Sequence, residues 1–166
     1  SSAASDVYKR QGLNIYLEYK NFDLTMFWQG VQGVDVISDL KKETDLWSGL
    51  NIGFLNKGKR VLDAWSPTNP NSTIPALSRS DTNNEKRVST YFVENGSFLK
   101  LRNIQLGYNV PKNFAQKMKM ERLRFYLSAQ NVFTIKSKEF TGVDPENANY
   151  GYPIPMNITF GINVGF

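Results

Sequence analysis

MNITFGINVGF, residues 156–166, decides the fold, because apolar side chains occupy every second position along it. Successive side chains of a β-strand point to opposite faces, so this strand has one wholly apolar face and one small, polar face. The apolar face carries Ile158, Phe160, Ile162, Val164 and Phe166. Such a face lies either against a protein core or against lipid, and a transmembrane barrel keeps the polar face for its lumen.

The same alternation predicts four further strands, so the fold class is all-β. They cover Gly12–Tyr19, Phe22–Gln29, Ile104–Val110 and Leu123–Gln130. The first two are separated only by Lys20-Asn21, which predicts a tight hairpin. Leu99 and Leu101 are out of phase with Ile104, and this predicts a bulge near Asn103. All five strands have about the length of barrel strands.

The connections between these strands alternate between short and long. Residues 20–21 and 111–120 form short links, whereas residues 31–97 and 134–155 form long ones. Outer-membrane barrels show this asymmetry, with short periplasmic turns and long extracellular loops. The pattern therefore predicts that loops 31–97 and 134–155 are extracellular and that the C-terminus is periplasmic. A short helix is expected within Asp45–Ala64.

Composition excludes several kinds of chemistry. The 166 residues include no cysteine and no histidine, so disulfides, thiol nucleophiles, imidazole bases and the usual zinc sites are excluded. Apolar residues make up 40% of the chain, which is too many for a disordered protein. Glu139, Asp144 and Glu146 lie in a predicted loop, where we expect solvation rather than a glycosidase pair, with a weak calcium site as the next interpretation. We therefore expect no enzyme, no cofactor and no metal.

The net charge of +5 raises the possibility of nucleic-acid binding. The one dense basic stretch contains Lys112, Lys117, Lys119, Arg122 and Arg124. It surrounds a predicted turn, and it lacks the interleaved aromatic residues that nucleic-acid binders use for stacking. We interpret it as a solvated basic turn and expect no nucleic-acid partner.

Several motifs, taken in order, resemble the SusC/RagA family of TonB-dependent outer-membrane transporters. The run GSFLKLRNIQLGYNVP at residues 96–111 resembles a late barrel strand of that family. YKNFDL at 19–24 is similar to its tight hairpin, AWSPTNP at 64–70 to its Trp-Thr-Pro loop, and AQNVFT at 129–134 to its penultimate strand. YPIP at 152–155 and the last strand complete the resemblance. It covers nearly everything from Gly12 to Phe166.

The resemblance implies that residues 12–166 are the C-terminal part of a 22-stranded transmembrane barrel, with about five of its strands. Family members import oligosaccharides or peptides, draw energy through TonB by way of an N-terminal region, and work with a SusD-like surface lipoprotein. The expected setting is the outer membrane of a Bacteroidetes-like bacterium. Residues 1–11 fit no predicted strand and no signal peptide, and we interpret them as a non-native or scar segment.

Aromatic residues are the remaining candidates for function. Trp47, Trp65, Tyr91, Tyr150 and Tyr152 lie in or beside the long loops, where they are candidates for contact with a substrate or partner. We favour packing in the loops or in the interfacial girdles. Trp28, Tyr108 and Phe133 lie near strand ends and are predicted girdle residues facing outer-membrane lipid. Phe160, Ile162, Val164 and terminal Phe166 resemble the signal read by the barrel assembly machinery.

One alternative remains open on periodicity alone. A secreted β-sandwich or jelly-roll carbohydrate-binding module would pack its apolar faces against each other and would show the same alternation. The unequal connections favour the barrel, because sandwiches seldom combine minimal turns at one end with a loop of more than sixty residues at the other.

Overall fold

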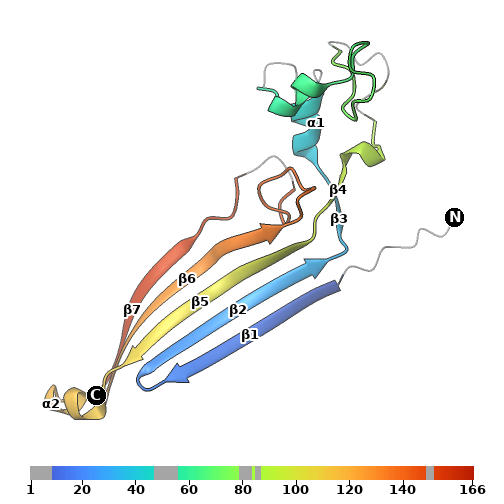
Figure 1. Cartoon of the computed structure of the whole chain (residues 1–166). Coiled ribbons are helices and arrows are strands. Elements are labelled where there is room, and N and C mark those ends of the chain that lie inside the picture. The colour runs from blue at the N-terminus through green and yellow to red at the C-terminus, as the bar shows by residue number, and fades with distance from the viewer. Residues whose placement is uncertain (1–8, 47–55, 79–83, 85–86, 149–151) are drawn as a thin grey trace. The chain divides into compact units, whose positions relative to one another are not determined.

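A computed structural model describes residues 9–46, 56–78, 84, 87–148 and 152–166 (Figure 1). The chain divides into two compact units. The first, called the sheet unit, comprises Ser1–Val34, Ser97–Lys136 and Ile154–Phe166. The second, called the loop unit, comprises Asp35–Gly96 and Ser137–Pro153.

The sheet unit is one five-stranded antiparallel sheet in which each strand pairs with the next (Figure 1). Its strands are β1 (Lys9–Tyr19), β2 (Phe22–Gln32), β5 (Phe98–Asn109), β6 (Arg122–Lys136) and β7 (Asn157–Gly165). The order β1-β2-β5-β6-β7 follows the sequence without a crossover. The prediction of an all-β fold with five strands is therefore confirmed.

The strand register joins the apolar faces of all five strands into one surface. One cross-strand row contains Leu17, Leu24, Leu106, Leu127 and Phe160. The neighbouring row on the opposite face contains Tyr16, Thr25, Gln105, Ser128 and Thr159. Because a slip of one residue would exchange the two faces, this register is fixed by the sequence pattern.

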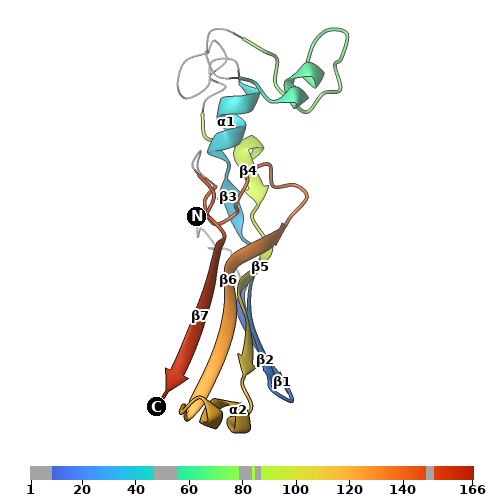
Figure 2. The ribbon, with the colours of Figure 1, turned by 90° about the vertical axis from the view of Figure 1, so that its left-hand side faces the viewer.

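The short connections have the predicted positions. Lys20 adopts a φ of 55° in the β1–β2 turn, which is a left-handed conformation typical of tight hairpins. The register shifts between Leu101 and Asn103, which confirms the predicted bulge. The link after β5 contains a short helix, α2 (Lys112–Lys117), that was not expected from the sequence. It lies at the same end of the sheet as the C-terminus (Figure 2).

Several strand boundaries differ from the sequence prediction, and β5 begins at Phe98 instead of Ile104 because residues 98–101 pair with both of the neighbouring strands. β1 begins at Lys9 instead of Gly12, because Lys9 and Gln11 pair with Gln32 and Gly30 of β2. For the same reason β2 extends past residue 31, into the predicted loop. β6 continues to Lys136 because residues 133–136 pair with residues 98–101 at the start of β5. A non-native origin of residues 1–11 stays a prediction, but the boundary of the fold does not lie at residue 12.

The loop unit has its own small framework. Strands β3 (Asp35–Ile37) and β4 (Val93–Asn95) pair, and three short helices accompany them: α1 (Asp39–Asp45), η1 (Lys59–Asp63) and η2 (Thr90–Phe92). The short helix expected within residues 45–64 is present as the 3-10 helix η1, and a further helix, α1, lies before it and ends at Asp45. α1 begins earlier because the Ser38 hydroxyl caps it by accepting from the Lys41 amide at 3.2 Å.

No helix among the described residues has the length and apolar character needed to cross a membrane.

Candidate functional site

The first candidate site is the apolar face of the sheet unit. Several of its side chains are about half exposed, from 47% for Leu106 to 65% for Phe160, while Leu24 and Ile104 are half-buried. Soluble monomers rarely leave so large an apolar patch in water. In the described part of the sheet unit, no second layer covers this face, which argues against a sandwich. The surface has the character of a lipid-facing barrel wall.

Aromatic side chains gather toward both ends of this face. Trp28 and Phe133 meet edge to face at 5.5 Å in the halves of β2 and β6 that lead into the long connections. Phe22 and Tyr108 lie 4.8 Å apart near the short turns. The eleven residues of β2 span roughly 36 Å along the strand and roughly 28 Å across a bilayer at a tilt of about 40°. This length suits an apolar band flanked by two aromatic girdles.

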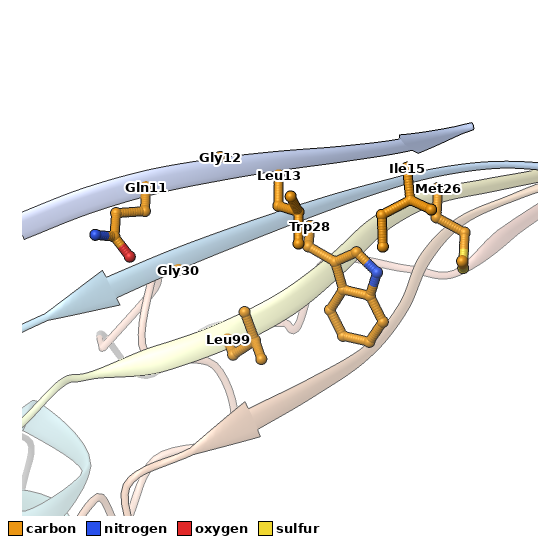
Figure 3. A pocket seen from close by; sticks show the side chains of 8 residues that line it. All are labelled: Gln11, Gly12, Leu13, Ile15, Met26, Trp28, Gly30 and Leu99. Carbon is orange, nitrogen blue, oxygen red and sulfur yellow. The ribbon is translucent and has the colours of Figure 1, made fainter. Parts of the chain in front are cut away.

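A shallow hollow interrupts the apolar face where Gly30 of β2 lacks a side chain (Figure 3). It is lined by Gln11, Gly12, Leu13, Ile15, Met26, Trp28, Gly30 and Leu99. No lining side chain is titratable, and the polar side-chain groups are the Gln11 amide and the Trp28 indole N–H. Binding and catalytic pockets usually contain several convergent polar groups, and the lining of this hollow does not provide them.

The opposite face holds a buried ionic cluster that the sequence analysis did not single out. The Asp23 carboxylate of β2 accepts from the Arg124 guanidinium of β6 at 2.5 Å and from the side-chain amide of Asn109 of β5 at 3.0 Å. The Arg124 side chain crosses β5 at Gly107, where any Cβ would overlap it and the Asp23 carboxylate. The prediction that Arg124 belongs to a solvated turn is therefore wrong, because its side chain lies on the polar face of the sheet.

A second glycine on this face accommodates an aromatic ring. Gly161 of β7 stands opposite Tyr126 of β6, and a Cβ at Gly161 would overlap the Tyr126 ring. The ring thus lies flat on β7 instead of projecting from the wall. Gly107 and Gly161 thus make room for the Arg124 and Tyr126 side chains to lie along the polar face of the sheet.

The predicted assembly residues lie on the edge strand β7. Phe160 stacks on Phe125 of β6 with ring centroids 6.4 Å apart. Ile162 and Val164 are exposed on the same face, and Phe166, just after the strand, is 85% exposed. The geometry leaves these side chains accessible to another protein, and their role as an assembly signal stays a prediction.

The loop aromatics have different environments. Trp47 and Tyr150 lie outside the described residues. Trp65 is partly exposed and directly precedes the Ser66–Asn69 turn. Tyr152 is 96% exposed and so remains accessible for a substrate or partner. For Trp65 and Tyr152, contact with a ligand stays a prediction.

Tyr91 has contacts within the loop unit on two sides. Its hydroxyl donates to Asp45 at 2.6 Å, and the Lys41 ammonium lies 4.2 Å from the centre of its ring. Asp45 is fully buried and also forms an ion pair with Arg60. Burial and the hydrogen bond to Asp45 raise the pKa of Tyr91 to about 12. Burial also lowers the pKa of Lys41. These contacts pack Tyr91 within the loop unit, and contact of its half-buried side chain with a substrate or partner stays a prediction.

The acidic residues of the second long loop are only partly solvated. Glu139 and Glu146 are exposed, but Asp144 is buried and accepts from the Glu146 backbone amide at 3.0 Å. The prediction of solvation is therefore wrong for Asp144, because its carboxylate closes a turn. No cluster of three acidic side chains that could hold a metal occurs among the described residues.

The charged clusters show what sequence analysis missed. Asp23 and Arg124 carry opposite charges on the polar faces of two predicted strands, and this signal was present in the sequence. The order of the strands was needed to bring them together across β5. Asp45 and Glu94 lie in a region without periodicity, where no sequence signal identifies a buried carboxylate.

Comparison with known proteins places this geometry in a family. No family model matches the chain. The chain is 33% identical to TonB-dependent receptor P3 of Formosa agariphila over 171 residues, covering 93% of the chain and 16% of that receptor. It is 31% identical to TonB-dependent receptor SusC of Bacteroides thetaiotaomicron, again over 93% of the chain and over 15% of the receptor. The chain thus spans about a sixth of the length of these relatives.

Solved structures give the same result. The chain superposes on a chain of the RagAB peptide transporter with a TM-score of 0.75 and 31% identity, covering 93% of this chain and 17% of that one. The RagAB peptide importer in an open-open state gives a TM-score of 0.77 at 28% identity. The matched proteins are named as receptors and transporters, not as enzymes.

Proposed function

Since the chain belongs to the SusC/RagA family of TonB-dependent receptors, we propose that its five strands are the last strands of a 22-stranded barrel that imports nutrients across the outer membrane. The observation that carries the proposal is the register of the sheet. It assembles one continuous apolar face and one polar face that holds a buried ion pair. A barrel wall needs this arrangement, with lipid on one side and a wet lumen on the other.

The cargo is an oligosaccharide or a peptide, and the protein moves it without changing it. Support comes from the relatives, one named SusC and another described as a peptide transporter. TonB supplies the energy through a region of the receptor outside residues 12–166. A SusD-like surface lipoprotein covers the outer mouth of the barrel, as the family resemblance implies.

An uptake assay tests this function. Cells with and without the full-length receptor are given fluorescent oligosaccharides and fluorescent peptides, and accumulation is measured with and without a proton uncoupler. We expect accumulation of one probe class that requires the receptor, TonB and the proton gradient. Accumulation that persists in TonB-null cells would contradict TonB-dependent import.

The orientation of the barrel has its own test. We place α2 and the C-terminus in the periplasm and the loop unit outside the cell. A cysteine in place of exposed Leu62 in the loop unit should react with a membrane-impermeant maleimide in intact cells. A cysteine in place of Lys117 at the end of α2 should react only after the outer membrane is opened. The reverse pattern would invert the proposed topology.

A further inference from the structure

The loop unit combines two segments that are far apart in the sequence, the first from residues 35–96 and the second from 137–153. The first segment has a framework in which β3 pairs with β4 and α1 directly follows β3 (Figure 2). The Ser38 amide donates to the Phe92 carbonyl at 2.8 Å, and the Phe92 side chain is buried. The start of α1 is therefore attached to the chain just before β4.

Glu94 of β4 connects this framework to the second segment. Its side chain is only 3% exposed. It accepts from the Thr141 amide at 2.9 Å and from the Thr141 hydroxyl at 2.8 Å. Burying a carboxylate is costly unless donors replace the lost water, and Thr141 supplies two donors. Docking of the second segment is thus matched to one acidic side chain of the first.

The hydroxyl groups around Thr141 form a consistent donor chain. The Thr141 hydroxyl uses its one proton toward Glu94, so the Ser38 hydroxyl, 3.4 Å away, donates to Thr141. Ser38 in turn accepts from the Lys41 amide, which caps α1. The contact between the two segments therefore extends directly into the first turn of the helix.

Three further charged side chains, those of Lys41, Asp45 and Arg60, extend this network to η1. The Lys41 ammonium lies 3.8 Å from Glu94 and donates to the Tyr91 carbonyl at 2.5 Å. Tyr91 donates to fully buried Asp45, which pairs with Arg60 of η1. Contacts thus run without a gap from residue 60 to residue 141 through two buried carboxylates. Displacing residues 137–148 would leave the buried Glu94 carboxylate without the two donors of Thr141.

We propose that the described parts of the two long connections of the importer work as a single body during transport, with Glu94 as the positioning residue that docks residues 137–148 onto the framework of β3, α1 and β4. The proposal rests on the proposed transport function, since it states which parts stay together while cargo passes. It excludes a cycle in which the second segment releases from Glu94 at each turnover.

A reversible disulfide tests the proposal in the full-length receptor. Ser38→Cys and Thr141→Cys replace two hydroxyls that are 3.4 Å apart, a separation that suits a disulfide after a small side-chain rotation. We expect the pair to oxidise in the membrane and the uptake rate to stay within about twofold of the reduced protein. The two single-cysteine variants control for loss of the cap and of the hydroxyl.

The outcomes separate this proposal from the proposed function. Uptake that falls at least tenfold on oxidation and returns on reduction would show that the segments must part, and would overturn the proposal. A pair that cannot be oxidised would overturn the contact itself. Absence of TonB-dependent uptake in the parent receptor would instead contradict the proposed function.

Limited proteolysis provides a second measurement that does not depend on transport or on the cysteine pair. Glu94→Gln retains the shape of the side chain but loses its charge, and we expect cleavage within residues 137–153 to accelerate at least tenfold. Glu139→Gln, a change at an exposed carboxylate of the same segment, is the matched control and should leave cleavage unchanged. Equal cleavage in Glu94→Gln and the parent would remove the positioning role of Glu94.

Discussion

Arginine substitutions along β5 test how the sheet meets the bilayer. Ile104 is the seventh of the twelve residues of β5, on the apolar face between Met26 and Ala129. A barrel places this position near the membrane midplane, where an arginine costs ~2–4 kcal/mol. At about 1.4 kcal/mol per tenfold change, Ile104→Arg should lower the folding equilibrium constant roughly 30- to 700-fold.

Two matched substitutions separate depth from face. Leu99→Arg lies on the same face near the end of β5, so its cost should fall to ~0–1 kcal/mol. Gln105→Arg points to the polar face, where water accommodates the charge, and its cost should also be small. The free energies come from urea unfolding of the full-length receptor in lipid vesicles. Equal losses for Ile104→Arg and Leu99→Arg would refute the reasoning, because burial in a protein core has no dependence on bilayer depth.

Three other predictions concern single contacts. Arg124→Gln should destabilise the barrel by about 2 kcal/mol, since it leaves the buried Asp23 carboxylate without its cation. Adding Asp23→Asn should recover part of this loss in the same unfolding assay. A double variant no more stable than Arg124→Gln would contradict a direct pairing of the two side chains. Removal of Phe166 should sharply lower the amount of receptor at the cell surface, measured by surface labelling, whereas unchanged abundance would refute an assembly signal. The pKa of Tyr91 is raised to about 12, so Tyr91 keeps its phenol proton in the folded loop unit at pH values above the ordinary pKa of 10.0. Its contribution to folding stability is therefore fully present below pH 10 and is lost as the pH rises toward 12. The ultraviolet difference spectrum between parent and Tyr91→Phe should show this late titration, and a phenolate signal at pH 10 would contradict it.

Period-two alternation allowed most of the sheet to be predicted from sequence. The hairpin at Lys20 and the bulge near Asn103 both follow from local pattern, because a turn and a phase change each leave a direct trace in the sequence. Strand ends were less predictable. Lys9 and Gln11 join β1 because β2 offers unpaired backbone groups opposite them, and this is a property of the partner strand.

The charged groups were harder to predict than the sheet. Asp23 and Arg124 are 101 residues apart, and only the strand order and the bare backbone at Gly107 bring them into contact. Glu94 and Asp45 lie in segments with neither alternation nor helical period, so their burial follows from tertiary contacts alone. Asp144 resembled a solvated loop residue for the same reason, since a turn-closing carboxylate has no distinct sequence signature.

Site-directed spin labelling tests the central claim most directly. Labels placed one at a time at Ile104, Gln105, Leu106, Ile162 and Asn163 of the full-length receptor in lipid vesicles are compared for collisions with oxygen, which concentrates in lipid, and with a water-soluble nickel reagent. We predict that oxygen accessibility is high at 104, 106 and 162, and that nickel accessibility is high at 105 and 163. Labels at 104, 106 and 162 that are shielded from both reagents would show a protein core behind the apolar face and would contradict a lipid-facing barrel wall.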